Sequence, residues 1–293
     1  FTLAQLSLGM ALAGLAVALL TLALLPGPRP QRVRTGAGLV VAAGLVAWSF
    51  PTQYAFLLER LHLKDEFDRA HPYGMSVETR AGIVAVESLQ PGAILWGGGV
   101  WDGAFNTDLV NNHNNVQRAL APVLFHDDPK DILVIGLASG SWAWVVAQDP
   151  RVKSVTLVEI NPGYLQVIPR FEPHRELLTD PRVEVVVDDG RRWLEHHPER
   201  KFDYVVSNTT FHWREHSTSL LSEEFLRLVQ QHLRPGGGVV MNVTGLEDAR
   251  FTAAKVFQHV ARFDNSVVAS DAPIDRPEAQ RRLRFAEWLA DPR

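Results

Sequence analysis

The stretch DILVIGLASGSWAWVV, residues 131–146, joins an aliphatic run to a turn of small residues and then to a segment of helical character. Gly136, Ala138 and Gly140 would let the backbone approach a ligand closely, and the N-terminus of the following helix would offer free N–H groups. Tight strand-to-helix turns also need small residues for purely structural reasons, so the turn alone does not identify a ligand. It does predict the strand, turn and helix with which open α/β sheets begin.

The remainder of the chain continues this alternation of strand and helix. Further strands are predicted at 153–159, 182–187, 202–207 and 237–243. Ser222 is the expected N-cap of a helix over 222–233, and a helical pattern is also predicted over 107–125. This order predicts an α/β fold over residues 107–293, a Rossmann-like, doubly wound parallel sheet.

A smaller unit precedes this domain. Alternating apolar and polar residues, with glycine at the turns, occur in three short segments, MSVETRAGIVAVES, AILWGG and VWDGAFN. They predict a small antiparallel β domain over residues 73–106. The charged run KDEFDR, residues 64–69, is typical of a solvated surface and predicts a linker over 59–72.

The N-terminal part of the chain is strongly apolar. Residues 1–25 and 36–58 contain no charged side chain, and about 20 apolar residues are enough for a helix to cross the ~30 Å hydrocarbon layer. A signal peptide would need a basic n-region and a cleavage site, neither of which is visible. A buried core helix is the alternative for the second stretch. We expect two transmembrane helices within residues 1–58, with the lipid bilayer as a partner.

Two further strand ends carry residues suited to a nucleoside. Glu159 ends the second strand of the sheet, about 20 residues after the glycine turn, where an acid can accept both hydroxyls of a ribose. Asp188 and Asp189 end the third strand, where they could bond an adenine amino group. Glu159 could instead be a surface acid, and the Asp pair a helix N-cap. Their spacing across successive strand ends favours the nucleoside site.

The fourth strand runs into a polar and aromatic segment. In FDYVVSNTTFHWREH, residues 202–216, no carboxylate follows the strand before Glu215. Its last five residues match the H-x-x-E-H pattern of inverted zinc peptidases, in which His212 and His216 would be metal ligands. That mechanism needs the motif on a helix, whereas here it follows a strand. No metal site is therefore predicted.

These motifs together resemble a known family. The run from Val123 to Val240, with LFHDDPKDILVIGLASGSWAWVVAQDPRVKSVTLVEINPGYL, VDDGRRWL and HLRPGGGVV, resembles the spermidine synthase-like aminopropyltransferases, a branch of the S-adenosylmethionine methyltransferase fold. The resemblance covers residues 73–270, and the apolar helices ahead of it are similar to the membrane-fused bacterial branch. It implies S-adenosylmethionine or its decarboxylated form as cofactor. The predicted cofactor-binding residues are Gly136, Ala138, Ser139, Gly140, Glu159, Asp188 and Asp189.

The chain also departs from the pattern of that family. Asn208 stands where the family carries an acid that helps to deprotonate the attacking amine, and Phe211 where it carries a second acid. Ser139 replaces an acid of the glycine turn, and the usual Tyr-His-Glu falls on residues 115–117. We therefore expect an altered site with Asn208 and His212 as candidate catalytic residues. The uncharged Ser139 would let S-adenosylmethionine bind at least as well as its decarboxylated form.

Two classes of function remain. The first is a membrane-anchored transferase that moves an aminopropyl or methyl-type group to a small-molecule or membrane-associated acceptor. The second is a non-catalytic nucleoside-binding or scaffold module of a membrane complex. Loss of the acids favours the second, and the intact ribose and adenine positions favour the first. The net charge of −4 gives no reason to expect nucleic acid as a partner, and the sequence leaves a homo-oligomer open.

Two observations about the membrane topology point to opposite orientations. The connector PGPRPQRVR carries Arg29, Arg32 and Arg34, and the positive-inside rule places it in the cytoplasm with the later residues on the far side. The nucleoside is made in the cytoplasm, which favours the opposite orientation. We expect the bacterial cytoplasmic membrane, with the soluble domain in the cytoplasm. The chain begins at Phe1 rather than Met, so upstream segments are also expected, and they leave the topology open.

Overall fold

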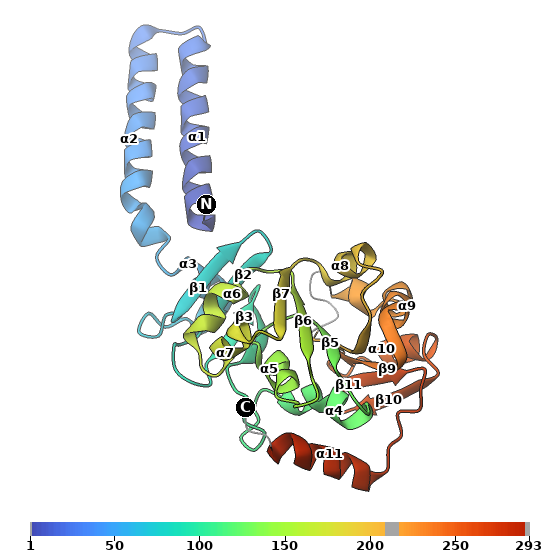
Figure 1. The fold of residues 1–293 in the computed structure, drawn as a ribbon. Coiled ribbons are helices and arrows are strands. Elements are labelled where there is room, and N and C mark those ends of the chain that lie inside the picture. Colours follow the sequence, from blue (N-terminus) through green and yellow to red (C-terminus); the bar gives the residue numbers. More distant parts are fainter. Residues whose placement is uncertain (1, 209–216, 291–293) are drawn as a thin grey trace. The chain divides into compact units, whose positions relative to one another are not determined.

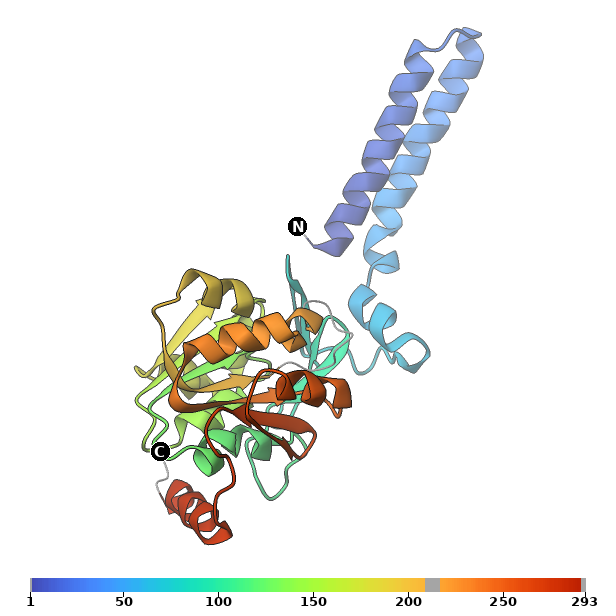
Figure 2. The same cartoon turned by 90° about the vertical axis from the view of Figure 1, so that its right-hand side faces the viewer.

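The computed structural model describes residues 2–208 and 217–290 and divides into two compact units, Phe1–Tyr73 and Gly74–Arg293. The first unit contains a helical hairpin of α1 (Leu3–Leu24) and α2 (Arg29–Gln53), which run side by side in both views (Figure 1, Figure 2). Both helices are long and apolar enough to cross a membrane, and neither contains a buried residue.

Arg32 joins the two helices near their connecting turn. Its Nε donates to the carbonyl of Leu22 at 3.1 Å, and the same guanidinium donates to the carbonyl of Ala23. Carbonyls in the last turn of a helix have no partner within the helix, so Arg32 satisfies two that α1 would otherwise leave to solvent. One of the three connector arginines therefore has a structural contact within the hairpin.

The segment predicted as a linker is partly helical. It contains most of α3 (Leu57–Leu63) and a short 3₁₀ turn, η1 (Lys64–Glu66). The amide of Tyr73 lies 3.4 Å from Glu59 Oε1, and the Tyr73 hydroxyl bonds His62 Nδ1. These contacts close the segment on itself and extend the first unit to Tyr73.

The second unit begins with the predicted antiparallel sheet. Its strands follow in chain order as β1 (Met75–Thr79), β2 (Gly82–Val86), β3 (Ile94–Gly97) and β4 (Val100–Ala104). Alternating side chains, among them Val84, Val86 and Leu95, enter the hydrophobic core of the unit.

The second sheet has seven strands in the order β10-β11-β9-β8-β5-β6-β7. The strands β5 to β9 are parallel, and β11 pairs antiparallel with β9 and with β10. The bounds are β5 (Asp131–Ile135), β6 (Ser154–Glu159), β7 (Val183–Val187), β8 (Phe202–Ser207), β9 (Leu233–Asn242), β10 (His259–Phe263) and β11 (Ser266–Ser270). The predicted fold class is confirmed, with two antiparallel pairings added at one edge.

Helices cover both faces of this sheet, and alternate side chains of β5 pack against them on opposite sides. Ile132 and Val134 pack with one set of helices, and Leu133 and Ile135 with the other. The first set comprises α4 (Ala121–Phe125), α5 (Ser141–Ala147), α6 (Tyr164–Val167) and α7 (His174–Thr179). The second comprises α8 (Gly190–His196), α9 (Glu223–His232) and α10 (Glu247–Ala254). Short 3₁₀ turns complete the unit as η2 (Val116–Leu120), η3 (Ile168–Arg170) and η4 (Thr218–Leu221).

The predicted helix over 107–125 is wrong in its first half. Residues 107–115 form a loop, and only η2 and α4 are helical. Asp108 Oδ1 accepts from the amides of Val110 and Asn111 at 2.7 and 3.1 Å, and buried Asn114 bonds both backbone groups of Ala104. Asp and Asn side chains of this kind compete with helical hydrogen bonds, which explains the loop.

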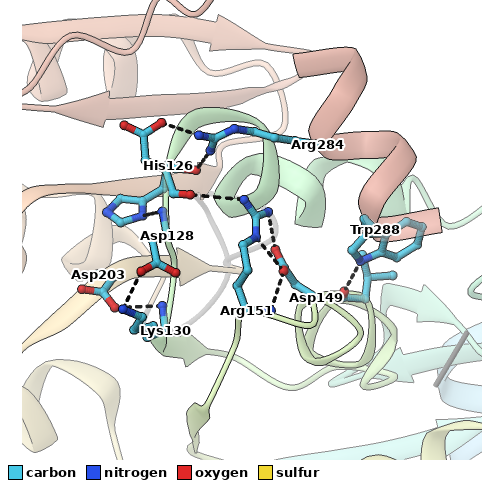
Figure 3. Close-up of polar contacts among 10 residues, drawn as sticks. His126, Asp128, Lys130, Asp149, Arg151, Asp203, Arg284 and Trp288 are labelled. Atoms are coloured by element: carbon cyan, nitrogen blue, oxygen red, sulfur yellow. Dashed lines mark hydrogen bonds and ion pairs between the residues drawn. The ribbon is translucent and has the colours of Figure 1, made fainter. Parts of the chain in front are cut away.

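The C-terminal helix α11 (Glu278–Ala290) docks against the core of the same unit. Figure 3 shows Arg284 beside the segment that precedes β5, where it donates to the carbonyl of His126 and pairs with Asp127. Trp288 donates from Nε1 to the carbonyl of Val145 in α5 at 3.2 Å. The Arg284 contact lies at the amino ends of the parallel strands.

Candidate nucleoside site

A cavity of about 350 Å³ lies at the carboxyl ends of β5, β6 and β8. The helices after β5 and before β8 lie on opposite faces of the sheet, so this is the topological switch point at which open α/β sheets bind ligands. Turns of the four-stranded sheet, at Ala81 and Gly82 and at Gly97 and Gly98, complete the wall. The cavity therefore lies between the two sheets of the second unit.

Glu159 lies in this cavity at the end of β6, and its carboxylate is held from both sides. Oε2 accepts from the amide of Leu137 at 2.7 Å, and Oε1 accepts from the amide of Asn161 at 2.7 Å. The side chain is buried but lines the cavity. Each carboxylate oxygen has a second lone pair, so the held carboxylate can still accept a hydroxyl from a ligand.

The glycine turn is shaped by its neighbours at the strand ends. Gly136 has φ +88°, and a Cβ there would lie 2.9 Å from the Asn208 carbonyl oxygen. Ala138 also has a positive φ and lines the cavity together with Gly136. Gly140 does not line the cavity; it is the N-cap of α5 and packs near Leu177. The turn thus presents two of its predicted residues to the cavity.

The structure places Ser139 away from the cavity, in a buried polar cluster. Its hydroxyl lies 2.8 Å from Ser141 Oγ, which in turn lies 2.8 Å from His174 Nε2 and donates to the carbonyl of Ala104 at 3.0 Å. Asn114 Nδ2 approaches Ser139 Oγ at 3.5 Å. The argument that Ser139 faces the charged end of the nucleoside has no support in this geometry. Its cofactor-binding role stays a prediction.

The two aspartates after β7 have different surroundings. Asp189 lines the cavity, and its Oδ1 caps α8 by accepting from the amide of Arg192 at 2.9 Å. Asp188 accepts from Arg192 Nε at 2.6 Å and is not among the described cavity residues. Position 190 requires glycine, because a Cβ there would lie 2.5 Å from Ile135 Cγ2. The N-cap interpretation therefore holds for Asp189, and of the two aspartates only Asp189 lines the described cavity.

Asn208 lines the cavity at the end of β8, where its backbone N–H donates to the carbonyl of Ile135 at 2.8 Å. This bond continues the pairing of β8 with β5 by one residue. The second predicted catalytic residue, His212, lies outside the described residues, as does the HWREH motif. An amide such as Asn208 can orient a substrate amine, but it is no base.

Sequence reasoning missed a pair of residues in the same cavity. Asp102, in β4, accepts at Oδ2 from the hydroxyl of Tyr164, the first residue of α6. Both side chains are buried, and both line the cavity. The signal in the sequence was an acid within the apolar strand VWDGAF, since a carboxylate in a buried strand needs a specific partner.

The charged side chains in the described lining of the cavity are all acidic. This lining contributes three carboxylates, those of Asp102, Glu159 and Asp189, and no Lys, Arg or His side chain. A low-dielectric cavity lined by one sign of charge concentrates ligands of the opposite sign. The described part of the cavity is therefore acidic, and it suits a cationic ligand.

The sheet order, the glycine turn after β5 and the cavity at the switch point define an α/β protein of the S-adenosylmethionine methyltransferase-like fold. Residues 116–271, more than half of the chain, match the Spermine/spermidine synthase domain. The chain belongs to this family.

Individual relatives agree with this assignment. The chain is 30% identical over 169 residues to polyamine aminopropyltransferase 2 of Hyperthermus butylicus, covering 54% of this chain and 55% of the relative. It is 28% identical over 160 residues to the polyamine aminopropyltransferase of Aeropyrum pernix, covering 51% of each. The chain thus spans about half the length of the curated relatives it matches.

Two solved structures share the fold. A spermidine synthase in complex with the transition state analogue AdoDATO has a TM-score of 0.56 at 21% identity, covering 69% of this chain and 74% of that one. The spermidine synthase of Thermotoga maritima has a TM-score of 0.54 at 18% identity, with the same coverage.

Proposed function

We propose that this protein is a membrane-anchored aminopropyltransferase that uses decarboxylated S-adenosylmethionine as donor and an amine as acceptor. The observation that supports this most is the acidic cavity at the switch point, in a chain of the Spermine/spermidine synthase family. The donor carries a sulfonium and an ammonium and lacks the carboxylate of S-adenosylmethionine. Three lining carboxylates favour such a dication over a ligand with a carboxylate of its own.

The roles proposed for the residues follow from their positions. Glu159 would accept the ribose hydroxyls, and Asp189 the adenine amino group, because they end neighbouring strands and line one cavity. Gly136 and Ala138 would lie against the nucleoside at the turn. In the reaction, the acceptor nitrogen bonds to the aminopropyl carbon, sulfur keeps the electron pair as methylthioadenosine leaves, and the nitrogen releases one proton.

A second candidate is nucleoside binding without transfer. It is favoured by Asn208, an amide that lines the cavity where the family resemblance predicts an acid. The acceptor nitrogen must lose a proton, and an amide cannot take it. The two candidates differ in whether the bound donor turns over with an amine.

The test uses the full chain in detergent and isothermal titration calorimetry with decarboxylated S-adenosylmethionine, S-adenosylmethionine and methylthioadenosine. We expect binding of the decarboxylated donor and of methylthioadenosine, and weaker binding of S-adenosylmethionine. Glu159→Gln should weaken both expected ligands roughly tenfold to a hundredfold, since it removes hydrogen bonds to a charged acceptor. Glu184→Gln, at an exposed site on β7, is the matched control.

The outcomes separate the candidates. Formation of methylthioadenosine with a diamine supports transfer, whereas binding without turnover supports the non-catalytic module. Equal affinity for S-adenosylmethionine would point instead to methyl-type transfer. Absence of binding of all three compounds would overturn both the transferase and the nucleoside-binding module. Because Glu159 also holds two backbone amides, the folding of the variant is checked by thermal unfolding.

We further propose that α1 and α2 anchor the protein in the bacterial cytoplasmic membrane with Gly74–Arg293 in the cytoplasm. Support for anchoring comes from their length and apolar surface, and support for the side comes from the proposed donor, which is made in the cytoplasm. The arginines of the connector argue against this side. Protease added outside sealed spheroplasts should leave the second unit intact, and its cleavage would refute the cytoplasmic location.

A further inference from the structure

We infer that Asp102 and Tyr164 form a subsite for a primary ammonium group of the substrate, an inference that rests on the proposed function of the cavity. Tyr164 donates its hydroxyl to Asp102 Oδ2, and both side chains line the cavity. The two residues come from separate elements, β4 in the four-stranded sheet and α6 after β6. The pair therefore spans the two sheets at the cavity.

Burial makes the Asp102 carboxylate selective for a ligand that carries a positive charge. Asp102 is only 7% exposed and Tyr164 only 3%, so most of the water around the acid is replaced by protein. A charge-assisted hydrogen bond from a buried phenol holds the carboxylate in one orientation. A fixed carboxylate facing a cavity can bind an ammonium that brings several N–H donors.

The neighbours of Asp102 place the subsite beside the glycine turn. Gly103, the next residue in β4, packs against the glycine turn: a Cβ there would lie 3.4 Å from Ser139 Oγ. Side chains alternate along a strand, so Asp102 points to the other face, into the cavity that Ala138 also lines. The subsite thus lies on the cavity side of β4, where this strand meets the glycine turn.

Two ammonium groups could occupy this subsite, the aminopropyl ammonium of the donor and the amine of the acceptor. Both are primary amines on a flexible chain, so the chemistry of recognition is the same. In either case Asp102 supplies a negative charge in the cavity, which the amide of Asn208 cannot supply. It also disfavours S-adenosylmethionine, whose carboxylate would face that of Asp102.

The test compares the full chain with Asp102→Asn, and measures affinity for decarboxylated S-adenosylmethionine and for methylthioadenosine, which has no ammonium. If the donor occupies the subsite, the variant should lose tenfold or more in affinity for the decarboxylated donor and keep its affinity for methylthioadenosine. If the acceptor occupies it, both affinities stay unchanged and the KM for 1,4-diaminobutane rises tenfold or more. Either result supports the subsite.

Controls separate this role from a structural one. Asp248→Asn makes the same change of charge at an exposed position in α10 and should alter neither quantity. Tyr164→Phe keeps the carboxylate and should show the same selectivity at a smaller, few-fold size. A uniform loss of affinity for every ligand in Asp102→Asn, or no change in affinity or KM, would overturn the inference.

Failure of the proposed function gives a different pattern. If the unmodified chain binds neither nucleoside, the proposed function fails, and the subsite is judged from binding of 1,4-diaminobutane alone. Tenfold weaker diamine binding in Asp102→Asn would still support an ammonium subsite. Equal diamine binding in both proteins, or none in the unmodified chain, would overturn it.

Discussion

His174 is a titratable residue enclosed within the second unit. It is fully buried beneath the glycine turn, with Nε2 at 2.8 Å from Ser141 Oγ. Because Ser141 donates to the carbonyl of Ala104, the imidazole must donate from Nε2 to Ser141. Burial lowers the pKa of His174 from 6.5 to about 4. The ring is thus neutral at pH 7, and it supports the turn through Ser141 rather than contacting a ligand.

This predicts a pH-dependent stability. Between about pH 6.5 and pH 4 the unfolded chain binds a proton at residue 174 that the folded chain does not, so the free energy of unfolding falls as the pH falls. The contribution is fully present above pH 6.5, and its loss by pH 4 is on the order of 3 kcal/mol. Urea unfolding of the full chain in detergent at pH 7, 5.5 and 4.5 measures it.

His174→Gln removes the titrating group while keeping a donor for Ser141. The free energy of unfolding should therefore change less with pH in this variant. His196→Gln, at an exposed position in α8, should leave the dependence unchanged. An equally steep dependence in His174→Gln would assign the effect to other residues.

At the same scale, the sequence predicts some site residues better than others. Glu159, Asp189 and Asn208 follow directly from strand ends, because the carboxyl ends of parallel strands converge on one edge. Asp102 could not be predicted to lie there, since its place depends on how the four-stranded sheet packs on the other. The sequence could not distinguish the roles of Asp188 and Asp189. In the structure the Arg192 side chain donates to Asp188, whereas the Arg192 backbone N–H donates to Asp189 as the N-cap of α8.

Among the elements, α11 makes a separable contribution to stability. Trp288 is buried against α5, and its Nε1 donates to the carbonyl of Val145. Trp288→Ala should lower the free energy of unfolding by about 3 to 5 kcal/mol, the usual cost of removing a buried aromatic side chain. Leu289→Ala, at an exposed neighbour, should change it by less than about 0.5 kcal/mol.

The same variant tests whether α11 has any part in the site. The Arg284 contact of this helix lies before β5, whereas the cavity lies at the carboxyl ends of the strands. Under conditions where Trp288→Ala remains folded, its affinity for methylthioadenosine should equal that of the unmodified chain. A tenfold loss would show that α11 acts on the cavity through α5.

Strands were easier to predict than loops for a physical reason. A strand buried on both faces, such as β5, is a nearly continuous aliphatic run that the local sequence reveals. The segment 107–115 misled the prediction because its Asn and Asp side chains bond the backbone locally, and no apolar period marks that choice. The four-stranded sheet was predicted from alternation alone, but its closure over the cavity depends on tertiary contacts such as Thr79 Oγ1 with Asn161 Oδ1 at 2.8 Å.

In the whole molecule, the boundary between the units lies after Tyr73, at the end of the segment predicted as a linker and not at the end of the apolar stretch. Charge and hydropathy place the end of the membrane segment near Leu58. The contacts of Glu59 and His62 with Tyr73 extend the first unit by some fifteen residues. A truncation after residue 58 would leave this segment without α2, so the informative cut lies between Tyr73 and Gly74.

We expect the first unit to anchor the protein and Gly74–Arg293 to fold without it. The hairpin exposes large apolar side chains along both helices, among them Met10 at 77% and Trp48 at 80%. Water would oppose that exposure by roughly 25 cal/mol for each Å² of apolar surface, whereas lipid would not. The second unit has hydrophobic clusters of its own on both faces of its sheet.

The full chain should therefore sediment with membranes and require detergent for extraction. The fragment 74–293 should remain in the supernatant, unfold cooperatively and bind methylthioadenosine within about twofold of the full chain. A fragment of the same chain carrying residues 55–293 serves as the control, since it keeps α3 but lacks the hairpin. If fragment 74–293 aggregates or melts without a cooperative transition while fragment 55–293 is well folded, then α3 and η1 are part of the packing of the second unit, and the boundary at Tyr73 is wrong.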